Sequence, residues 1–331
     1  MQENGRLIGL GLALIDSKIR YPGVSLPMKN ENLPRFLDEQ KNIEMQPGGT
    51  IPNTLTAYLS FPKNRLVKLF CCIGEDKRGD LFAEYSKPAL GIPQRNKFEP
   101  TGVWVTIKDK NNKTLDGGGY YGAGKTAIVP QSELREEKNN FFITDIYTCK
   151  ISHLLDHAET TLSHIKKEGG LFILSLGGTG SLRADRGKLS QILTSFGAEP
   201  SIVFANYNEI TYLFGSNNFS EILTTAFPNT RILVVTLGKE GSIVRFDGQV
   251  KHFPAFHVKK IIDEEGAGDC FAGTFLGDLL GTSYKKLTWK EICHSAHVAS
   301  YASSLVVQSA SARLNEKAIK KVLEFSDALY I

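Results

Sequence analysis

The feature that most constrains the fold is a series of short apolar runs, each bounded by turn residues. Strands with one wetted face would alternate apolar and polar residues, and these runs are too continuous for that. Several are followed by stretches with the period of an amphipathic helix. This alternation of strand and helix predicts an α/β fold with a mostly parallel central sheet and helices on both faces. The runs are residues 7–15, 67–73, 141–146, 171–176, 202–205, 232–237 and 242–246.

Two stretches break this alternation. Residues 17–46 and 97–126 are richer in polar and turn residues, and the second holds the alternating run 103–107 followed by Asn111 and Asn112. That pattern is typical of a β-hairpin. We therefore predict a small β-sheet lid, made of residues 17–46 and 97–126, on a large α/β core made of residues 1–16, 47–96 and 127–331.

Composition places the chain among globular proteins, since 41% of its 331 residues are hydrophobic. The net charge of +4 comes from 39 basic and 35 acidic residues scattered along the chain, so no nucleic-acid partner is indicated. The apolar stretch at residues 7–15 falls short of the roughly 18 residues that a membrane span needs, so no membrane partner is expected. Five cysteines without zinc-type spacing indicate free thiols, and we expect a cytoplasmic protein that acts on a small-molecule substrate.

We expect an active site where Gly266, Ala267 and Gly268 precede an apolar stripe with helical spacing. A helix start presents unpaired amides and the positive end of the helix dipole, and glycines let a phosphate approach them. Asp269, in the first turn, is placed to take a proton from an attacking hydroxyl. The same spacing also suits a tight turn with an ordinary helix-start aspartate, so the local pattern leaves both interpretations open.

Five motifs follow one another over nearly the whole chain. They are Gly48–Asn53 (G-G-x-x-x-N), Gly74–Gly79 (G-x-D-x-x-G), Asn206–Glu209 (N-x-x-E), Thr236–Gly241 (T-x-G-x-x-G) and Asp263–Asp269 (D-x-x-G-A-G-D). Each match alone is weak, but five in this order resemble the ribokinase family, the PfkB-type carbohydrate and nucleoside kinases. The resemblance implies a ribokinase-like fold with a β-lid and an enzyme that uses ATP and Mg²⁺.

The resemblance also implies roles for individual residues. Asp269 corresponds to the catalytic base, with the amides of Gly266, Ala267 and Gly268 as an anion hole. The residues at the sugar would be Asp16, at the end of the first strand, and Gly48, Gly49 and Asn53. The residues at ATP would be Asn206, Thr236, Gly238 and Gly241, with Asn206 and Glu209 holding Mg²⁺ mostly through water. Helix capping is the alternative role for Asn53, Asn206 and Glu209.

One position departs from the family pattern. Glu264 stands where the family usually has threonine, and Glu265 follows it. The family's monovalent-cation site, which takes K⁺, involves this loop. Two extra carboxylates would repel a triphosphate unless they point away, meet Lys259 or Lys260, or engage a cation.

The acceptor is predicted from less general segments. Residues 48–54, 174–177 and 308–314 resemble bacterial inosine-guanosine kinases, and the regions 113–114 and 121–123 resemble adenosine kinases. The leading prediction is transfer of phosphate to the 5′-hydroxyl of a purine nucleoside, which is inosine, guanosine or adenosine. A sugar kinase and a non-catalytic regulator that binds a nucleotide or sugar are the alternatives. Trp104 suits stacking on a base or contact with a second subunit, so a homodimer through the lid stays open.

A competing nucleotide motif lies at Gly119–Thr126, which fits the P-loop pattern G-x-x-x-x-G-K-[ST]. A P-loop needs a buried strand before it and a helix after it. Here a polar, turn-like stretch precedes the motif and Pro130 follows it closely. A P-loop NTPase is therefore the less favoured hypothesis.

Overall fold

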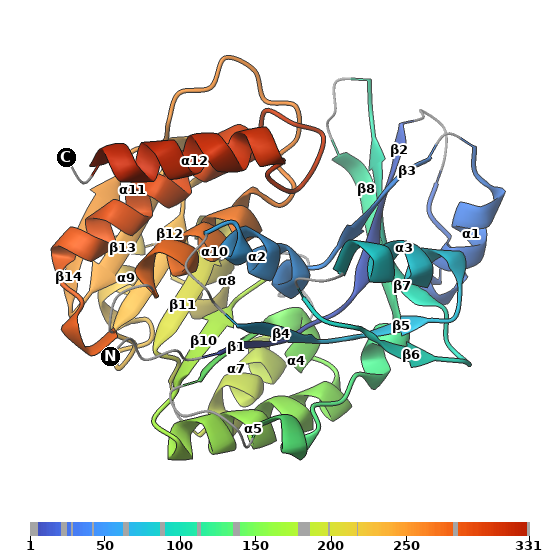
Figure 1. Ribbon diagram of the computed structural model, residues 1–331, viewed down its shortest axis with the longest axis horizontal. Helices are drawn as coiled ribbons and strands as arrows, with labels where there is room; N and C mark the ends of the chain where they lie inside the picture. Colours follow the sequence, from blue (N-terminus) through green and yellow to red (C-terminus); the bar gives the residue numbers. More distant parts are fainter. Residues whose placement is uncertain are drawn as a thin grey trace.

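The computed structural model describes residues 6–20, 25–27, 29–41, 43–61, 66–86, 90–110, 114–134, 140–177, 186–197, 199–216, 218–280 and 284–329. A large sheet with helices on both sides fills most of the molecule, and a smaller sheet stands at one edge of it (Figure 1). None of the helices in these ranges is long and apolar enough to span a bilayer.

The large sheet has eight strands in the order β14-β13-β12-β11-β10-β9-β1-β4. Its pairs are parallel from β4 to β12, while β13 and β14 form an antiparallel edge. The prediction of a mostly parallel central sheet is confirmed. The strands are β1 (Leu7–Leu10), β4 (Val67–Phe70), β9 (Phe141–Asp145), β10 (Leu171–Ser175), β11 (Ile202–Asn206), β12 (Ile232–Thr236), β13 (Ser242–Phe246) and β14 (Gln249–Phe253).

Successive residues of each strand point to opposite faces of the large sheet, which explains the continuous apolar runs. Leu7 and Ile143 pack in one core cluster, whereas their neighbours Ile8 and Phe142 pack in another. The first face is covered by α2 (Thr50–Leu59), α10 (Ala267–Leu279) and α11 (Trp289–Val306), with α12 (Glu316–Leu329) against α11. The second face is covered by α4 (Ile146–Cys149), α5 (Ser152–Lys167), α7 (Arg186–Ser195), α8 (Tyr207–Phe214) and α9 (Phe219–Thr225).

The small sheet has the strand order β3-β2-β7-β8, with β3 at Ile43–Gly48, β2 at Leu14–Arg20, β7 at Thr101–Lys108 and β8 at Thr114–Gly122. Ile15 and Val103 lie in the same core cluster as Leu33 of α1 (Leu33–Glu39) and Phe82 of α3 (Lys77–Ser86). Because side chains alternate along a strand, the neighbours of Ile15 on β2 and of Val103 on β7 project from the other face. That face carries polar side chains toward the large sheet. A short pair, β5 (Cys72–Gly74) and β6 (Gln94–Asn96), links the two sheets.

The first apolar run is not the single strand that we expected. β1 ends at Leu10 in the large sheet, and β2 begins at Leu14 in the small one. The chain changes sheets at Gly11, where a side chain would overlap Ile51 of α2. Asp16 therefore lies inside β2 of the small sheet rather than at the end of a core strand.

Other sequence predictions compare with the structure as follows. The run 67–73 also divides, into β4 and β5. The predicted hairpin is present as antiparallel β7 and β8, while Asn111 and Asn112 lie outside the described residues. β2 starts before the predicted domain boundary after residue 16, and the division into core and lid stays a prediction. All five cysteines are free thiols.

Candidate active site

Asp269 lies in the first turn of α10, at the carboxyl edge of the large sheet. Gly266 is the N-cap residue and adopts φ +77°, a conformation that glycine accepts and side chains resist. The first intrahelical bond runs from the amide of Cys270 to the carbonyl of Gly266 at 2.8 Å. The Ala267 amide donates to Glu264 at 3.3 Å, so this amide is partly committed to the turn. The amides of Gly268 and Asp269 come before any intrahelical acceptor, as an anion site requires.

A chain of hydrogen bonds holds Asp269 in place. The side-chain amide of Asn53, on α2, donates to Oδ2 of Asp269 at 3.1 Å. Nε of Arg313, in the segment before α12, donates to Oδ1 of Asn53 at 2.9 Å, and the guanidinium lies 3.5 Å from the centroid of the Tyr85 ring. Because a guanidinium only donates, it forces the Asn53 amide to turn its NH₂ group toward Asp269. Asn53 lies inside α2 and does not cap it, so the capping alternative is wrong for this residue.

The other predicted substrate residues gather beside this chain. Asp16 lies next to Gly48, where any side chain would overlap its carboxylate. Gly49 is the N-cap residue of α2, which places Gly48 and Gly49 one helical turn before Asn53. The structure thus brings β2, β3 and the start of α2 together near Asp269.

Burial gives these carboxyl groups unusual acidities. It raises the pKa of Asp269 to about 7; the hydrogen bond from Asn53 opposes the shift, while Asp16 and Asp145 reinforce it. Burial, followed by the negative charge of Glu265, raises the pKa of Asp16 to about 7 as well. A carboxylate that titrates near neutrality is well matched to general-base catalysis at physiological pH.

A pH profile tests this acidity. We expect kcat/KM to rise with pH through about 7, because Asp269 accepts a proton only when ionised and its pKa is about 7. Asp16 must ionise too before it accepts hydrogen bonds at full strength, so the acid limb should have a slope of about one to two on logarithmic axes. Initial rates from about pH 5 to about pH 9 would measure the slope and the midpoint of this limb. A flat profile from about pH 5 upward would mean that Asp269 has an ordinary carboxyl pKa.

Asn206 and Glu209 lie where β11 ends and α8 begins. They form a capping box, in which the Asn206 side chain accepts from the Glu209 amide and the Glu209 carboxylate accepts from the Asn206 amide, both at 2.8 Å. The capping alternative is therefore confirmed for this pair, yet the capping box uses only one carboxylate oxygen of Glu209. Burial, opposed by the Asn206 amide and reinforced by Asp269, raises the pKa of Glu209 to about 8. A buried carboxylate of this kind would be stabilised by a nearby cation.

The predicted ATP residues follow the next strand along the sheet. Thr236 ends β12 directly opposite Asn206 in the register of β11 and β12. Gly238 begins a 3₁₀ turn, η4 (Gly238–Glu240), and Gly241 leads into β13. These residues share the carboxyl edge of the large sheet, where ligands collect in open α/β folds.

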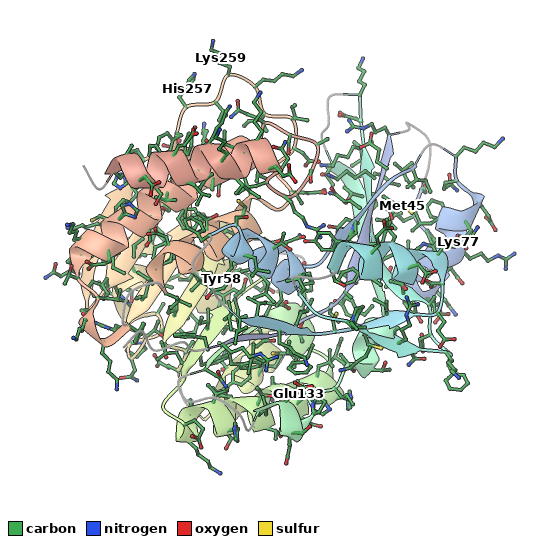
Figure 2. All side chains as sticks on the ribbon, viewed as in Figure 1. Met45, Tyr58, Lys77, Glu133, His257 and Lys259 are labelled. Atoms are coloured by element: carbon green, nitrogen blue, oxygen red, sulfur yellow. The ribbon has the colours of Figure 1, made fainter. Side chains whose placement is uncertain are left out.

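Glu264 and Glu265 are accommodated in different ways. Glu264 is exposed, whereas Glu265 forms ion pairs at 3.2 Å with Lys18 and with Lys108, both from the small sheet. Of the outcomes left open, Glu264 faces solvent, and Glu265 pairs with lysines other than Lys259 and Lys260. Those two are exposed, and Figure 2 shows Lys259 projecting outward from the loop before α10. The reason is that the small sheet brings its own lysines to this loop.

The P-loop hypothesis is also wrong. Gly119 to Gly122 belong to β8, an antiparallel strand of the small sheet, and only the 3₁₀ turn η2 (Ala123–Thr126) follows. Lys125 lies 3.4 Å from Glu99 and stacks over Tyr120. Residues 127–134, which the structure describes, hold only the short turn η3 and no long helix, so the amides that a P-loop uses to cradle phosphate are not presented here.

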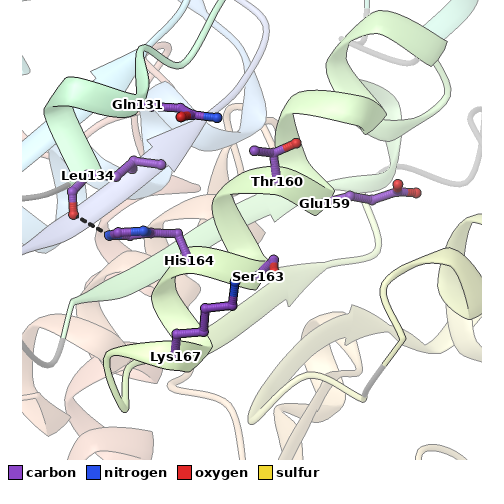
Figure 3. A pocket seen from close by; sticks show the side chains of 7 residues that line it. All are labelled: Gln131, Leu134, Glu159, Thr160, Ser163, His164 and Lys167. Atoms are coloured by element: carbon purple, nitrogen blue, oxygen red, sulfur yellow. Dashed lines mark hydrogen bonds between the residues drawn. The ribbon is translucent and has the colours of Figure 1, made fainter.

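A surface groove lies between η3 (Gln131–Leu134) and α5 (Figure 3). His164 contacts the carbonyl oxygen of Leu134 there at 2.6 Å. Because α5 covers the face of the large sheet opposite α2 and α10, this groove does not include the predicted catalytic residues. The groove is lined by Gln131, Leu134, Glu159, Thr160, Ser163, His164 and Lys167.

The sequence matches the model of a known enzyme family. The model of the pfkB family carbohydrate kinases matches residues 15–319. This chain belongs to that family. Adenosine kinase of Schizosaccharomyces pombe is 24% identical over 258 residues, which cover 70% of this chain and 73% of that protein.

Two solved structures show the same fold. Adenosine kinase from Sinorhizobium meliloti has a TM-score of 0.81 at 16% identity and covers 97% of this chain and 99% of its own. A fructokinase double mutant from Vibrio cholerae, with fructose, ADP and potassium ion bound, has a TM-score of 0.78 at 17% identity and covers 98% of this chain and 99% of its own. The predicted ribokinase-like fold is confirmed. As a pfkB family member with adenosine kinase relatives, the protein is an ATP-dependent kinase, and the non-catalytic alternative is set aside.

Sequence reasoning missed several residues of this site. Arg313 lay in a segment that we used only for substrate resemblance, and Lys18 and Lys108 carried no motif. Neither lysine lay in a predicted strand, and lysines usually face solvent, so no sequence pattern marked them as buried. Here Lys18 and Lys108 are buried.

Proposed function

We propose that the protein transfers the γ-phosphoryl group of ATP to the 5′-hydroxyl of a purine nucleoside, either inosine and guanosine or adenosine. The observation that carries the nucleoside part is a row of side chains across the small sheet. Asp16 on β2 is the register partner of Trp104 on β7, which is in turn opposite Gly119 on β8. Residues in register project from the same face, so a carboxylate and an indole ring stand side by side.

The row fits the two halves of a nucleoside. Gly119 leaves room for the indole, since a side chain there would overlap the Trp104 ring. The Trp104 ring meets Tyr147 of α4 edge-on, with ring centroids 6.2 Å apart, across the boundary between the two sheets. Burial, and after it the charges of groups that include Asp145, Glu209 and Asp269, raises the pKa of Tyr147. The carboxylate suits ribose hydroxyls, and the aromatic pair suits a flat base.

Each residue of the site then has its own role in the reaction. Asp16 accepts hydrogen bonds from the ribose, which directs the 5′-hydroxyl toward Asp269. Asp269 takes the hydroxyl proton as the oxygen attacks the γ-phosphorus, the bond to the β-phosphate oxygen breaks and ADP leaves. The amides of Gly266 and Gly268 donate to the oxygens of the group in transfer, and that of Ala267 joins them when it leaves its long bond to Glu264. Asn53 and Arg313 keep the carboxylate of Asp269, the general base, oriented.

Mg²⁺ is the cofactor that this chemistry needs. The donor set fits it, because Glu209 keeps a carboxylate oxygen outside the capping box and is buried close to Asp269. Mg²⁺ keeps most of its waters, so it needs few protein ligands in direct contact. When bound, Mg²⁺ would supply positive charge that offsets the negative charge of the phosphates. Asn206 and Glu209 would hold it through water.

A substrate panel tests the proposal. With Mg-ATP, we expect ADP release with inosine, guanosine or adenosine at a kcat/KM at least about 10-fold above that with ribose or fructose, since the sugars leave the aromatic pair unused. Trp104→Ala should lower nucleoside kcat/KM by about 10-fold and leave sugar values within about twofold. Turnover with ribose or fructose and none with nucleosides would instead establish a sugar kinase.

A further inference from the structure

The loop that leads into α10 carries a closed cluster of four charges, which we call the lysine clamp. Nζ of Lys18 lies 2.5 Å from Asp263 and 3.2 Å from Glu265. Nζ of Lys108 lies 3.0 Å from Asp263 and 3.2 Å from Glu265. Each lysine meets one oxygen of each acid, so all four carboxylate oxygens face an ammonium group.

The lysine clamp is buried and balanced in charge. The side chains of Lys18, Lys108 and Asp263 are 3%, 5% and 6% exposed, and that of Glu265 is 32% exposed. Burial would raise the pKa of Asp263, but hydrogen bonds from Lys18 and Lys108 outweigh it and the pKa is lowered. Two positive and two negative charges leave no net charge for a further ion to neutralise.

A monovalent cation does not fit beside this cluster. The family resemblance implies a K⁺ site at this loop, and the oxygen atoms that hold K⁺, whether carbonyl or carboxylate, must lie away from other positive charges. Here the carboxylates of Asp263 and Glu265 already face two ammonium groups, which would repel K⁺ at short range. Glu264, the third acid of the loop, is exposed.

The lysine clamp also joins the small sheet to the anion hole. Lys18 and Lys108 belong to β2 and β7, whereas Asp263 and Glu265 precede the Gly266 N-cap directly. The main chain of the loop is tied to the end of α11 as well, by a 2.7 Å bond from the Ile262 amide to the Val307 carbonyl. The position of the small sheet and the position of the anion hole are therefore linked through four ion pairs.

We propose that Lys18 and Lys108 take the place of the monovalent cation at this loop. They are positioning residues that align the N-terminus of α10 with the γ-phosphoryl group, and turnover does not depend on added K⁺. The inference needs only the kinase activity and holds for a nucleoside or a sugar acceptor.

The first experiment compares salts on the unaltered full-length chain. ATP is supplied as its Tris salt, with the acceptor that the substrate panel identifies, in about 100 mM potassium chloride or tetramethylammonium chloride. We expect kcat and the KM for ATP to agree within about twofold between the two salts. The midpoint of thermal unfolding without substrate should also be the same in both salts. Stimulation by K⁺ of about 10-fold or more, or a higher unfolding midpoint in K⁺ alone, would overturn the proposal.

The second experiment removes one charge. Lys108→Met should lower kcat by about 10²-fold with a smaller rise in the acceptor KM, because the anion hole acts on the group in transfer. Lys108→Arg should restore most of that loss, since it keeps the charge. Arg20→Met is the matched control: Arg20 is the register partner of Lys108 and pairs with Glu44 on the surface, so its kcat should stay within about twofold.

A folded Lys108→Met variant with unaltered kcat would contradict a positioning role. If that variant does not fold, Glu265→Gln replaces it, because this side chain lies at the exposed rim of the lysine clamp. A fall in kcat of about 10-fold in Glu265→Gln supports the proposal, and an unaltered kcat overturns it.

Discussion

Asp269→Asn is expected to lower kcat by at least about 10²-fold, and by as much as about 10⁴-fold, while the protein stays folded and still binds ATP. Asparagine has the shape of aspartate but no basic oxygen that can take the hydroxyl proton. The substitution also removes a negative charge from a buried site where burial already raises the pKa of this carboxyl group to about 7. Stability should therefore be kept or increased at neutral pH.

Steady-state kinetics and calorimetric titration with ATP separate these effects. Asp156→Asn is a suitable control, because Asp156 is an exposed aspartate on α5, on the opposite face of the large sheet from α10. Its kcat should match that of the unaltered protein. An Asp269→Asn variant with nearly normal turnover would remove Asp269 as the base, whatever the acceptor is.

Asp16→Ala is expected to lower kcat/KM for the nucleoside by about 10²-fold to 10⁴-fold. Two hydrogen bonds to a charged carboxylate would be lost, and each contributes about 1.5–3 kcal/mol. The KM for ATP should stay within about twofold, because Asp16 lies on β2 of the small sheet, away from Asn206 and Thr236 at the carboxyl edge. Glu44→Ala on β3 is the control carboxylate, since its pair with Arg20 is exposed and contributes little.

A 2′-deoxynucleoside sharpens this test. If Asp16 binds the ribose hydroxyls, Asp16→Ala should lower kcat/KM less for a substrate that lacks one of them than for the ribonucleoside. The comparison is a double-mutant cycle between enzyme and substrate. Equal losses for both substrates would show that Asp16 acts on something other than the 2′-hydroxyl.

Helix α10 was largely predictable from the sequence. The apolar stripe after Asp269 became α10, with Phe271 and Phe275 buried in the core. Local periodicity and an N-terminal Gly-Ala-Gly depend on neighbours in the chain, and such signals survive without tertiary information. The roles of Asp269, Gly266, Ala267 and Gly268 in catalysis stay predictions, as do those of the substrate and ATP residues and a homodimer through the small sheet.

The division of the first apolar run was not predictable. Residues 7 to 15 read as one strand because hydrophobicity continues across Gly11 and Leu12, although the chain moves there from one sheet to another. Leu12 stays buried in the turn, since it packs in the same core cluster as Ile8. Burial without strand pairing has the same sequence pattern as a buried strand, so the position of Asp16 was misjudged.

The sequence by itself determined the α/β class, the order of the motifs and the kinase family, because each depends on residues that are close together in the chain. The tertiary structure alone decided which charges meet. Lys18 and Asp263 are 245 residues apart, and Lys108 and Asp263 are 155 residues apart. Their contact depends on how β2 and β7 lie against the loop before α10, and no local pattern encodes that placement. For the same reason, the acidic pair that departs from the family pattern could be understood only once Lys18 and Lys108 were seen beside it.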